Sequence, residues 1–309
     1  MSRSGAAAFA AVELRVRRLL DGRLQGDHLG VRIGPGSEAE EVVRYRSGED
    51  DVRRIDWNVT ARSQELHVWR SRAEHELQTW VLLDDTASMA FGTDELEKRD
   101  LALMVTAALG VLTDGPGNRL GLARLHDGGV HWSVPLPGRQ AGRRALRAGT
   151  GEVGPRRVTP AGDLAAALRE LHARRRHRGL RVVVSDFIEP DGTVTRPFSW
   201  EPELRRMGAH HDVIVVEVLD PRELELPDVG PVVLVDPETG HRCDVWTSLP
   251  GVRDRYARTA AEHRNQVAAA VRAAGASHVV LRTDRDWVTD LARQVQRRHG
   301  SRQIRRRNR

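Results

Sequence analysis

The feature that most constrains the fold of this chain is a series of apolar runs that alternate with helical patterns. Residues 78–83 contain almost no polar side chain, and further strand-like runs are LRVVVSDF (180–187), HDVIVVEVLD (211–220) and HVVLRTD (278–284). Strands buried on both faces of a parallel sheet have this composition. The segments between them predict helices at 139–147, 163–172, 251–274 and 286–296. The alternation predicts an α/β domain with an open, mainly parallel, Rossmann-like sheet flanked by helices.

One more helix is predicted directly after the first run. Asp94 and Glu97 have the spacing of a capping box, and the apolar residues from Leu101 to Leu112 recur on one helical face. Two hairpins are also predicted, one turning at residues 127–129 (DGG) and one turning at 238–240 (ETG).

The chain divides into three parts by pattern. Residues 1–77 contain an amphipathic helix at 6–20, followed by short β-like pieces between Gly and Pro residues, which predicts an N-terminal α+β segment with hairpins. The α/β domain is expected over 78–297. Residues 298–309 are rich in arginine and are expected to form a disordered basic tail.

Oxygen-bearing side chains follow two of the predicted strands. Asp84, Thr86 and Ser88 follow the first, and Ser185 and Asp186 end the LRVVVSDF run. In open α/β sheets, ligands bind beyond the carboxyl ends of the strands. Carboxylate and hydroxyl oxygens suit magnesium or manganese. The alternative is that Thr86 and Ser88 only cap the loop, with Asp84 accepting their hydrogen bonds.

The stretch VLLDDTASM (81–89) resembles the metal-ion-dependent adhesion site of von Willebrand factor type A domains, whose first loop reads D-x-S-x-S. The resemblance implies a magnesium or manganese ion held by Asp84, Thr86, Ser88 and Asp186.

The chain departs from this pattern at the middle ligand. The family has a Thr there, and the matching stretch TPAGDLAAAL has Gly162. Asp163 or Thr159 could substitute, a water could fill the position, or the metal site could be weak or lost. The sequence therefore predicts a degenerate site.

A second resemblance covers most of the chain. Residues 45–70, YRSGEDDVRRIDWNVTARSQELHVWR, look like the hallmark G-D-D-x-R-x-I-D-W-x-x-x-A-R of the family called domain of unknown function 58, with Glu49 at its first Asp. The segments 217–240 and 278–287 are similar to short actinobacterial members. This resemblance implies a von Willebrand type A-like domain, no general enzymatic activity, and a MoxR-type AAA+ ATPase as partner in chaperone-like maturation of client proteins.

The hallmark itself admits two interpretations. Arginine–carboxylate pairs around a tryptophan could clamp the N-terminal segment onto the sheet. Trp and Arg are also typical anchors of protein interfaces, which would make the motif a partner-docking surface. The residues concerned are Asp50, Arg53, Asp56, Trp57 and Arg62.

Composition narrows the classes of function and location. The chain has 309 residues, a net charge of +6 and one cysteine, Cys243. Lys98 is the sole lysine among 49 basic residues, which is typical of a GC-rich genome rather than of a nucleic-acid-binding surface. No apolar run is long enough to span a membrane, and a chain with no disulfide suits a reducing compartment. We expect a cytoplasmic protein that does not bind nucleic acid.

Three functions remain open from the sequence. The leading one is a non-enzymatic protein-binding module, in which a partner's acidic residue completes the shell of the bound ion. The second is a metal-dependent phosphoryl-transfer enzyme, although Thr86 stands where the haloacid dehalogenase pattern needs Asp. The third is a metal-free scaffold, which the glycine at position 162 favours.

Overall fold

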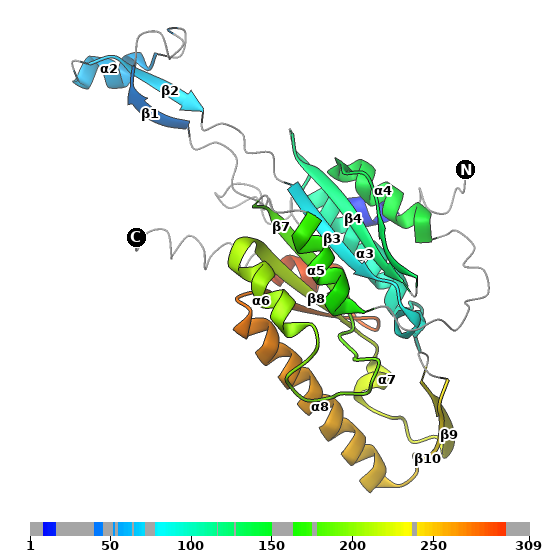
Figure 1. Cartoon of the computed structure of the whole chain (residues 1–309). Coiled ribbons are helices and arrows are strands. Elements are labelled where there is room, and N and C mark those ends of the chain that lie inside the picture. Colours follow the sequence, from blue (N-terminus) through cyan, green and yellow to red (C-terminus); the bar gives the residue numbers. More distant parts are fainter. Residues whose placement is uncertain are drawn as a thin grey trace.

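The computed structural model of the chain describes residues 9–16, 40–45, 52, 55–63, 65–71, 78–115, 117–126, 128–149, 163–174, 178–236 and 240–294. Its centre is a seven-stranded sheet in the order β11-β8-β7-β3-β4-β5, with β6 also paired to β4 (Figure 1). The strands are β3 (Gln78–Asp84), β4 (Arg119–His126), β5 (Gly129–Trp132), β6 (Leu136–Pro137), β7 (Leu180–Ser185), β8 (Asp212–Leu219) and β11 (Ser277–Arg282).

The pairing of these strands confirms the predicted sheet. β4, β3, β7, β8 and β11 are parallel neighbours, whereas β5 and β6 are antiparallel to β4. The hairpin expected at residues 127–129 joins β4 to β5. β3 and β7 are buried along nearly their whole length, as their composition predicts.

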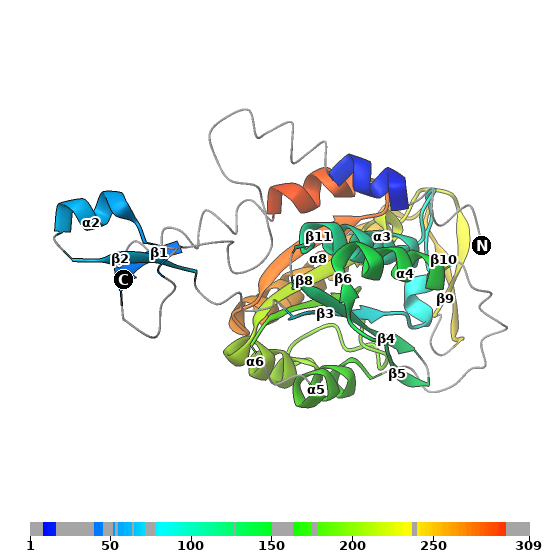
Figure 2. The ribbon, with the colours of Figure 1, turned by 90° about the horizontal axis from the view of Figure 1, so that it is seen from above.

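Helices cover both faces of the sheet, as Figure 2 shows from above. They are α3 (Lys98–Leu112), α4 (Gly138–Gly149), α5 (Leu164–Arg174), α6 (Glu201–His210), α7 (Pro221–Leu224) and α8 (Pro250–Ala273). Alternate residues of β3 point to opposite faces, so Val81 and Leu83 pack with α3 and α4 while Trp80 and Leu82 pack with α5, α6 and α8. The sheet thus has a separate apolar core on each face.

Helices α3 and α4 approach closely because both carry glycine at the contact. A Cβ atom on Gly110 would lie only 2.4 Å from the backbone oxygen of Gly138. This contact fixes α4 against α3 on one side of the sheet.

The structure differs from the sequence predictions at two helices. Helix α3 begins at Lys98 rather than near Asp94, because Glu97 is the N-cap and forms the capping box with Asp100. Helix α6 was not predicted. Leu204 and Met207 are its buried apolar residues, and buried Glu201 and Glu203 fill the rest of its inner face, so its apolar periodicity is weak.

The N-terminal part contributes to two different places. Strands β1 (Glu40–Arg44) and β2 (His67–Ser71) form an antiparallel pair next to α2 (Trp57–Ser63), and Figures 1 and 2 both draw this unit apart from the seven-stranded sheet. A helix at 9–16, by contrast, buries Phe9, Val12 and Val16 in the core of the α/β domain. Packing therefore assigns residues 9–16 to the domain that the sequence pattern began at residue 78.

Other predictions lie outside the described residues. The basic tail at 298–309 is among these, as are Asp50, Arg53, Thr159 and Gly162. Within the described ranges, no helix is long and apolar enough to cross a membrane.

Candidate functional site

The candidate site lies at the carboxyl edge of the sheet, where strand order reverses. β3 pairs with β4 on one side and with β7 on the other, and the chain crosses from β4 over β3 to reach β7. Asp84 ends β3 and Ser185 ends β7, so the topology brings their side chains together. This is the position at which open α/β sheets bind ligands.

The loop after β3 forms a buried hydrogen-bond network. Asp84 Oδ1 accepts from the Thr86 backbone N at 3.1 Å and from Thr86 Oγ1 at 2.7 Å, and Thr86 Oγ1 lies 3.2 Å from Ser88 Oγ. Ser185 Oγ donates to Asp84 Oδ2 at 2.6 Å and accepts from the Phe187 backbone N at 3.0 Å. The structure therefore brings together Asp84, Thr86 and Ser88 as predicted, and adds Ser185 to them.

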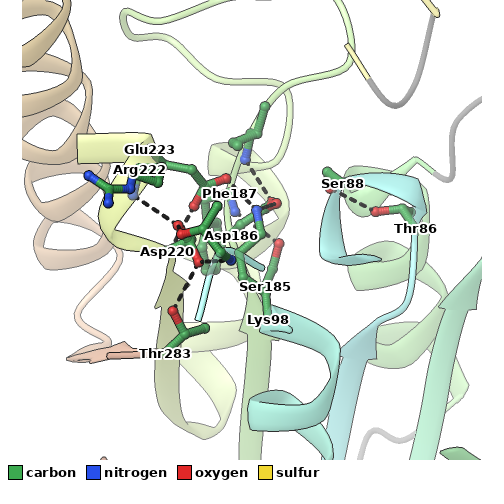
Figure 3. A network of polar contacts seen from close by, with 12 residues as sticks. Thr86, Ser88, Lys98, Ser185, Asp186, Phe187, Asp220, Arg222, Glu223 and Thr283 are labelled. Carbon is green, nitrogen blue, oxygen red and sulfur yellow. Dashed lines mark hydrogen bonds and ion pairs between the residues drawn. The ribbon is translucent and has the colours of Figure 1, made fainter. Parts of the chain in front are cut away.

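Asp186, the predicted last ligand, is paired with a residue that sequence reasoning passed over. Lys98 Nζ donates to Asp186 Oδ2 at 2.7 Å and to Glu223 Oε1 at 2.5 Å (Figure 3). The side chains of Lys98 and Asp186 are each 1 % exposed, so this is an interior ion pair. The only signal in the sequence was that Lys98 is the single lysine of an arginine-rich chain.

Asp220 extends the network to the end of β8. Its carboxylate accepts from the Thr93 backbone N at 2.9 Å, from Thr93 Oγ1 at 2.6 Å and from Thr283 Oγ1 at 3.1 Å. It also caps the short helix α7 through Arg222 N, while Glu223 Oε2 accepts from Asp220 N at 3.0 Å. Glu223 thus links Lys98 to the end of β8.

Burial and neighbouring charges shift the pKa values of Asp84 and Asp186 in opposite directions. Burial, with the nearby charge of Asp186, raises the pKa of Asp84 to about 6. Burial alone would raise the pKa of Asp186, but the charge and hydrogen bond of Lys98, the Ile188 backbone N–H and the charge of Arg264 together lower that pKa. Burial alone would lower the pKa of Lys98, but the carboxylates of Asp186 and Glu223 together raise it. The Lys98–Asp186 pair is therefore ionised throughout the neutral range.

Arginine residues neutralise the carboxylates around this centre. Asp85 lies 2.6 Å from Arg99 Nε and 2.6 Å from Arg124 Nη2. Arg264 Nη1 donates to the Asp186 backbone oxygen and to Glu217 Oε1, each at 2.7 Å. Asp85 and Glu217 are thus paired with cations from the chain itself.

We tested whether the residues present fit the magnesium or manganese ion that the resemblance implies. An ion held by Asp186 would have to share that carboxylate with an ammonium group 2.7 Å away. Asp163 is exposed and caps α5, with its Oδ1 accepting from Ala166 N at 3.1 Å. In the part of the chain that the structure describes, no three His, Cys, Asp or Glu residues are grouped to hold a metal. The arrangement does not fit a divalent ion.

Among the described residues of the 45–70 motif, Asp56 caps a helix. Asp56 Oδ1 accepts from the backbone N of Asn58 at 2.9 Å and of Val59 at 3.1 Å, which caps the start of α2. Trp57 is 68 % exposed, and Arg62 is exposed in the last turn of α2. A clamp onto the sheet would bury Trp57, so its exposure favours the docking interpretation.

A second exposed apolar feature was missed by sequence reasoning. Strands β9 (Pro231–Val235) and β10 (Arg242–Trp246) pair antiparallel, as the hairpin pattern predicts. Pairing puts the following residues on one side of this hairpin, all of them exposed, and we call them the hairpin face: Pro231, Val233, Val235, Arg242, Asp244 and Trp246. The signal available in the sequence was the apolar run PVVLV, which we interpreted only as a strand.

The segment around the hairpin is acidic, unlike the chain as a whole. Residues 220–249 contain seven acidic residues against two arginines, in a chain whose net charge is +6. The acidic residues are Asp220, Glu223, Glu225, Asp228, Asp236, Glu238 and Asp244. The hairpin segment is therefore acidic in sequence, whereas the hairpin face itself combines exposed apolar side chains with one residue of each charge, Arg242 and Asp244.

Comparison with known proteins identifies relatives over nearly the full chain. Residues 41–266 match the model of a family described as Protein of unknown function DUF58. The chain is 46 % identical over 299 residues to the uncharacterized protein Rv1480 of Mycobacterium tuberculosis, covering 96 % of this chain and 90 % of the relative. An uncharacterized protein of Mycobacterium bovis, Mb1516, matches to the same extent.

Solved structures with related shapes are distant in sequence. The conserved hypothetical protein BatB of Bacteroides thetaiotaomicron is 10 % identical, with a TM-score of 0.43 over 72 % of this chain and 98 % of BatB. The SpRpn10 VWA domain is 12 % identical, with a TM-score of 0.37 over 71 % of this chain and 95 % of that domain.

Proposed function

Because the chain belongs to the DUF58 family, and because its carboxyl edge is closed by internal hydrogen bonds, we propose a non-enzymatic protein-interaction module that docks its partner on the hairpin face. The observation that carries this proposal is the exposure of Val233 (56 %), Val235 (52 %) and Trp246 (61 %) side by side on one β-hairpin. Contiguous exposed apolar residues mark interaction sites more often than isolated ones do.

The chemistry of the hairpin face indicates what kind of partner it takes. Tryptophan is the residue most often found at energetic centres of interfaces, and two valines beside it supply flat apolar area. The face also exposes Arg242 and Asp244, which favours a partner surface with one residue of each charge beside an apolar pocket. Thr247 Oγ1 donates to the Gly230 oxygen at 2.7 Å, which closes the base of the hairpin. Arg253 of α8 donates to the Thr247 oxygen, which ties that base to the domain.

We propose that this partner is a MoxR-type AAA+ ATPase, and that the pair acts in chaperone-like maturation of client proteins in the cytoplasm. The support for the partner is the resemblance of residues 45–70 to the family hallmark, together with the charge of the hairpin segment. A partner's acidic residue bound through a divalent ion is not part of the proposal, because Lys98 already pairs with Asp186.

Co-purification of the purified protein with the MoxR-type ATPase of the same genome tests this proposal. Trp246→Ala combined with Val233→Ser is expected to lower the affinity at least tenfold, since burying such side chains contributes about 1.5–3 kcal/mol each. Trp57→Ala tests the rival docking site in the 45–70 motif, because Trp57 is exposed on α2 to a similar extent. Loss of binding with Trp57→Ala and not with the hairpin variant would move the docking site to the 45–70 motif, and retention by both would reject the hairpin face.

Phosphoryl transfer receives no support from the geometry. Both oxygens of Asp84 accept hydrogen bonds from Thr86 and Ser185, so the carboxylate is held rather than presented as a nucleophile. Turnover of a phosphate ester in the presence of manganese, lost in Asp84→Asn, would overturn this conclusion.

A further inference from the structure

A buried ammonium group pairs with Asp186, which is one of the two carboxylates that the adhesion-site pattern would use to hold a divalent ion. Lys98 Nζ contacts carboxylate oxygens of Asp186 and Glu223, at 2.7 Å and 2.5 Å. The side chains of Lys98 and Asp186 are 1 % exposed and that of Glu223 is 14 % exposed, so bulk water screens these contacts little. The positive charge that balances Asp186 is therefore supplied by the chain.

The backbone of Lys98, from which the ammonium extends, is held in place by hydrogen bonds. Lys98 is the first residue of α3, its backbone N donates to the Phe91 oxygen at 2.9 Å, and the Glu97–Asp100 capping box fixes the helix start beside it. Asp186 follows β7 and Glu223 lies in α7. One side chain thus joins three elements that surround the carboxyl edge of the sheet (Figure 3).

The type of residue is itself informative. Every other basic residue of this chain except histidine is arginine, so the composition disfavours lysine wherever arginine can serve. An ammonium is a compact point charge with three donors, whereas guanidinium is a larger planar fork. A compact cation between two carboxylates is the closest equivalent that a side chain offers to a small metal ion.

The other predicted carboxylate ligand also has protein partners. Asp84 accepts three hydrogen bonds, from Thr86 N, Thr86 Oγ1 and Ser185 Oγ. With Lys98 on Asp186, both carboxylates of the expected ligand set are satisfied within the fold.

We propose that Lys98 is a tethered cation that takes the place of the divalent ion, so that the carboxyl edge of this sheet is assembled without metal. The inference concerns the site alone and does not rest on the proposed partner. It assigns Lys98 a positioning role, because its ammonium holds the ends of β7 and α7 together as a bound ion would.

Metal binding to the unmodified protein gives the first test. Protein stripped with EDTA is dialysed against Mn²⁺ or Mg²⁺, and its Tm is measured with and without each ion. We expect no saturable binding below millimolar concentration that depends on Asp186, and the same Tm in EDTA, Mn²⁺ and Mg²⁺. One Mn²⁺ bound per chain, raising the Tm and lost in Asp186→Asn, would overturn the proposal.

Removal of the ammonium gives the second test. Lys98→Met keeps much of the side-chain volume but leaves Asp186 and Glu223 without their cation, and we expect the Tm to fall by about 10 °C. Adding Asp186→Asn should recover part of this loss, because the double variant buries one fewer unbalanced charge. Arg293→Ala is the control, since it breaks a surface ion pair with Asp290 in which Arg293 is 58 % exposed. A Lys98→Met protein as stable as this control would contradict the inference, and if Lys98→Met does not fold, the Mn²⁺ dialysis of the unmodified protein decides.

Discussion

Thr93 Oγ1 donates to Asp220 Oδ1 at 2.6 Å across 127 residues of chain, and Thr93 N donates to the other oxygen of the same carboxylate at 2.9 Å. Asp220 is 0 % exposed and also accepts from Thr283. One carboxylate therefore joins the loop before α3, the end of β8 and the residue after β11. Asp220 and Lys98 therefore each join separate elements at the carboxyl edge of the sheet.

Substitution of Asp220 should reveal how much these contacts contribute to stability. Asp220→Ala leaves the donors of Thr93, Arg222 and Thr283 without their acceptor, and each buried donor left unpaired costs about 1–3 kcal/mol. We expect the free energy of unfolding, measured in urea, to fall by about 3 kcal/mol or more. Asp290→Ala removes a carboxylate from a surface ion pair and should change it by less than about 0.5 kcal/mol. Equal effects of the two substitutions would show that Asp220 has no such role.

The helix at 9–16 should be needed for the stability of the α/β domain. Phe9 is 2 % exposed and packs in the core beside α3 and α4, so Phe9→Ala should lower the free energy of unfolding by about 3–5 kcal/mol. Leu14 is 49 % exposed on the same helix, and Leu14→Ala should change it by less than about 1 kcal/mol. Urea denaturation of both variants measures the difference, and similar effects would show that the helix does not pack as described.

A buried histidine predicts a dependence of stability on pH. Burial, followed by the charge of Arg181, lowers the pKa of His211 to about 4, against about 6.5 in the unfolded chain. At pH values between about 4 and about 6.5, His211 is protonated in the unfolded chain but neutral in the folded protein. This histidine therefore lowers the free energy of unfolding as pH falls through that range. The total loss is on the order of 3 kcal/mol, because one pKa unit corresponds to about 1.4 kcal/mol.

Comparison with a variant isolates this contribution. The raised pKa of Asp84 acts in the opposite direction over a similar range, because the folded protein there holds a proton that the unfolded chain releases. Unfolding in urea should therefore be followed for the wild type and for His211→Gln at several pH values. The difference in stability between them should change in favour of His211→Gln as pH falls, and a difference that is constant with pH would refute the assignment.

A glycine in β4 gives a further prediction about packing. A Cβ atom on Gly121 would lie 2.6 Å from ring atoms of Trp80, which is 1 % exposed and in edge contact with Trp132. Gly121→Ala should therefore destabilise the protein by about 1–3 kcal/mol through overpacking. Trp80→Leu in the same background should recover part of that loss, and thermal unfolding of the four proteins measures the coupling. Independent, additive effects would show that the ring does not cover Gly121.

Local patterns predicted the sheet because burial on both faces leaves a direct trace in composition, as in β3 and β7. The loop from Asp84 to Ser88 was found for the same reason, since its oxygens follow immediately after a buried strand. Lys98 could not be assigned from the sequence, because its partners lie 88 and 125 residues further along the chain and a single lysine has no periodicity.

Two other features depended on the tertiary structure. Helix α6 places two carboxylates, Glu201 and Glu203, on its buried face, so its sequence lacks the apolar period of a buried helix. These carboxylates are paired with Arg196, Arg205 and Arg206, which the sequence does not show. The valines and the tryptophan of the hairpin face are plain in the sequence, but only the structure shows that none of the helices it describes covers them.

The two ends of the described chain contact each other in the structure, so one contact partner is synthesised long before the other. Arg15 Nη2 lies 2.5 Å from Asp286 Oδ1, and Phe9 shares a core with Trp287 and Leu291. On the ribosome the helix at 9–16 emerges first, yet its last partners are made about 270 residues later, which at typical elongation rates is tens of seconds. Until translation is almost complete, the nascent chain therefore carries an amphipathic helix that lacks the part of its apolar partner supplied by Trp287 and Leu291.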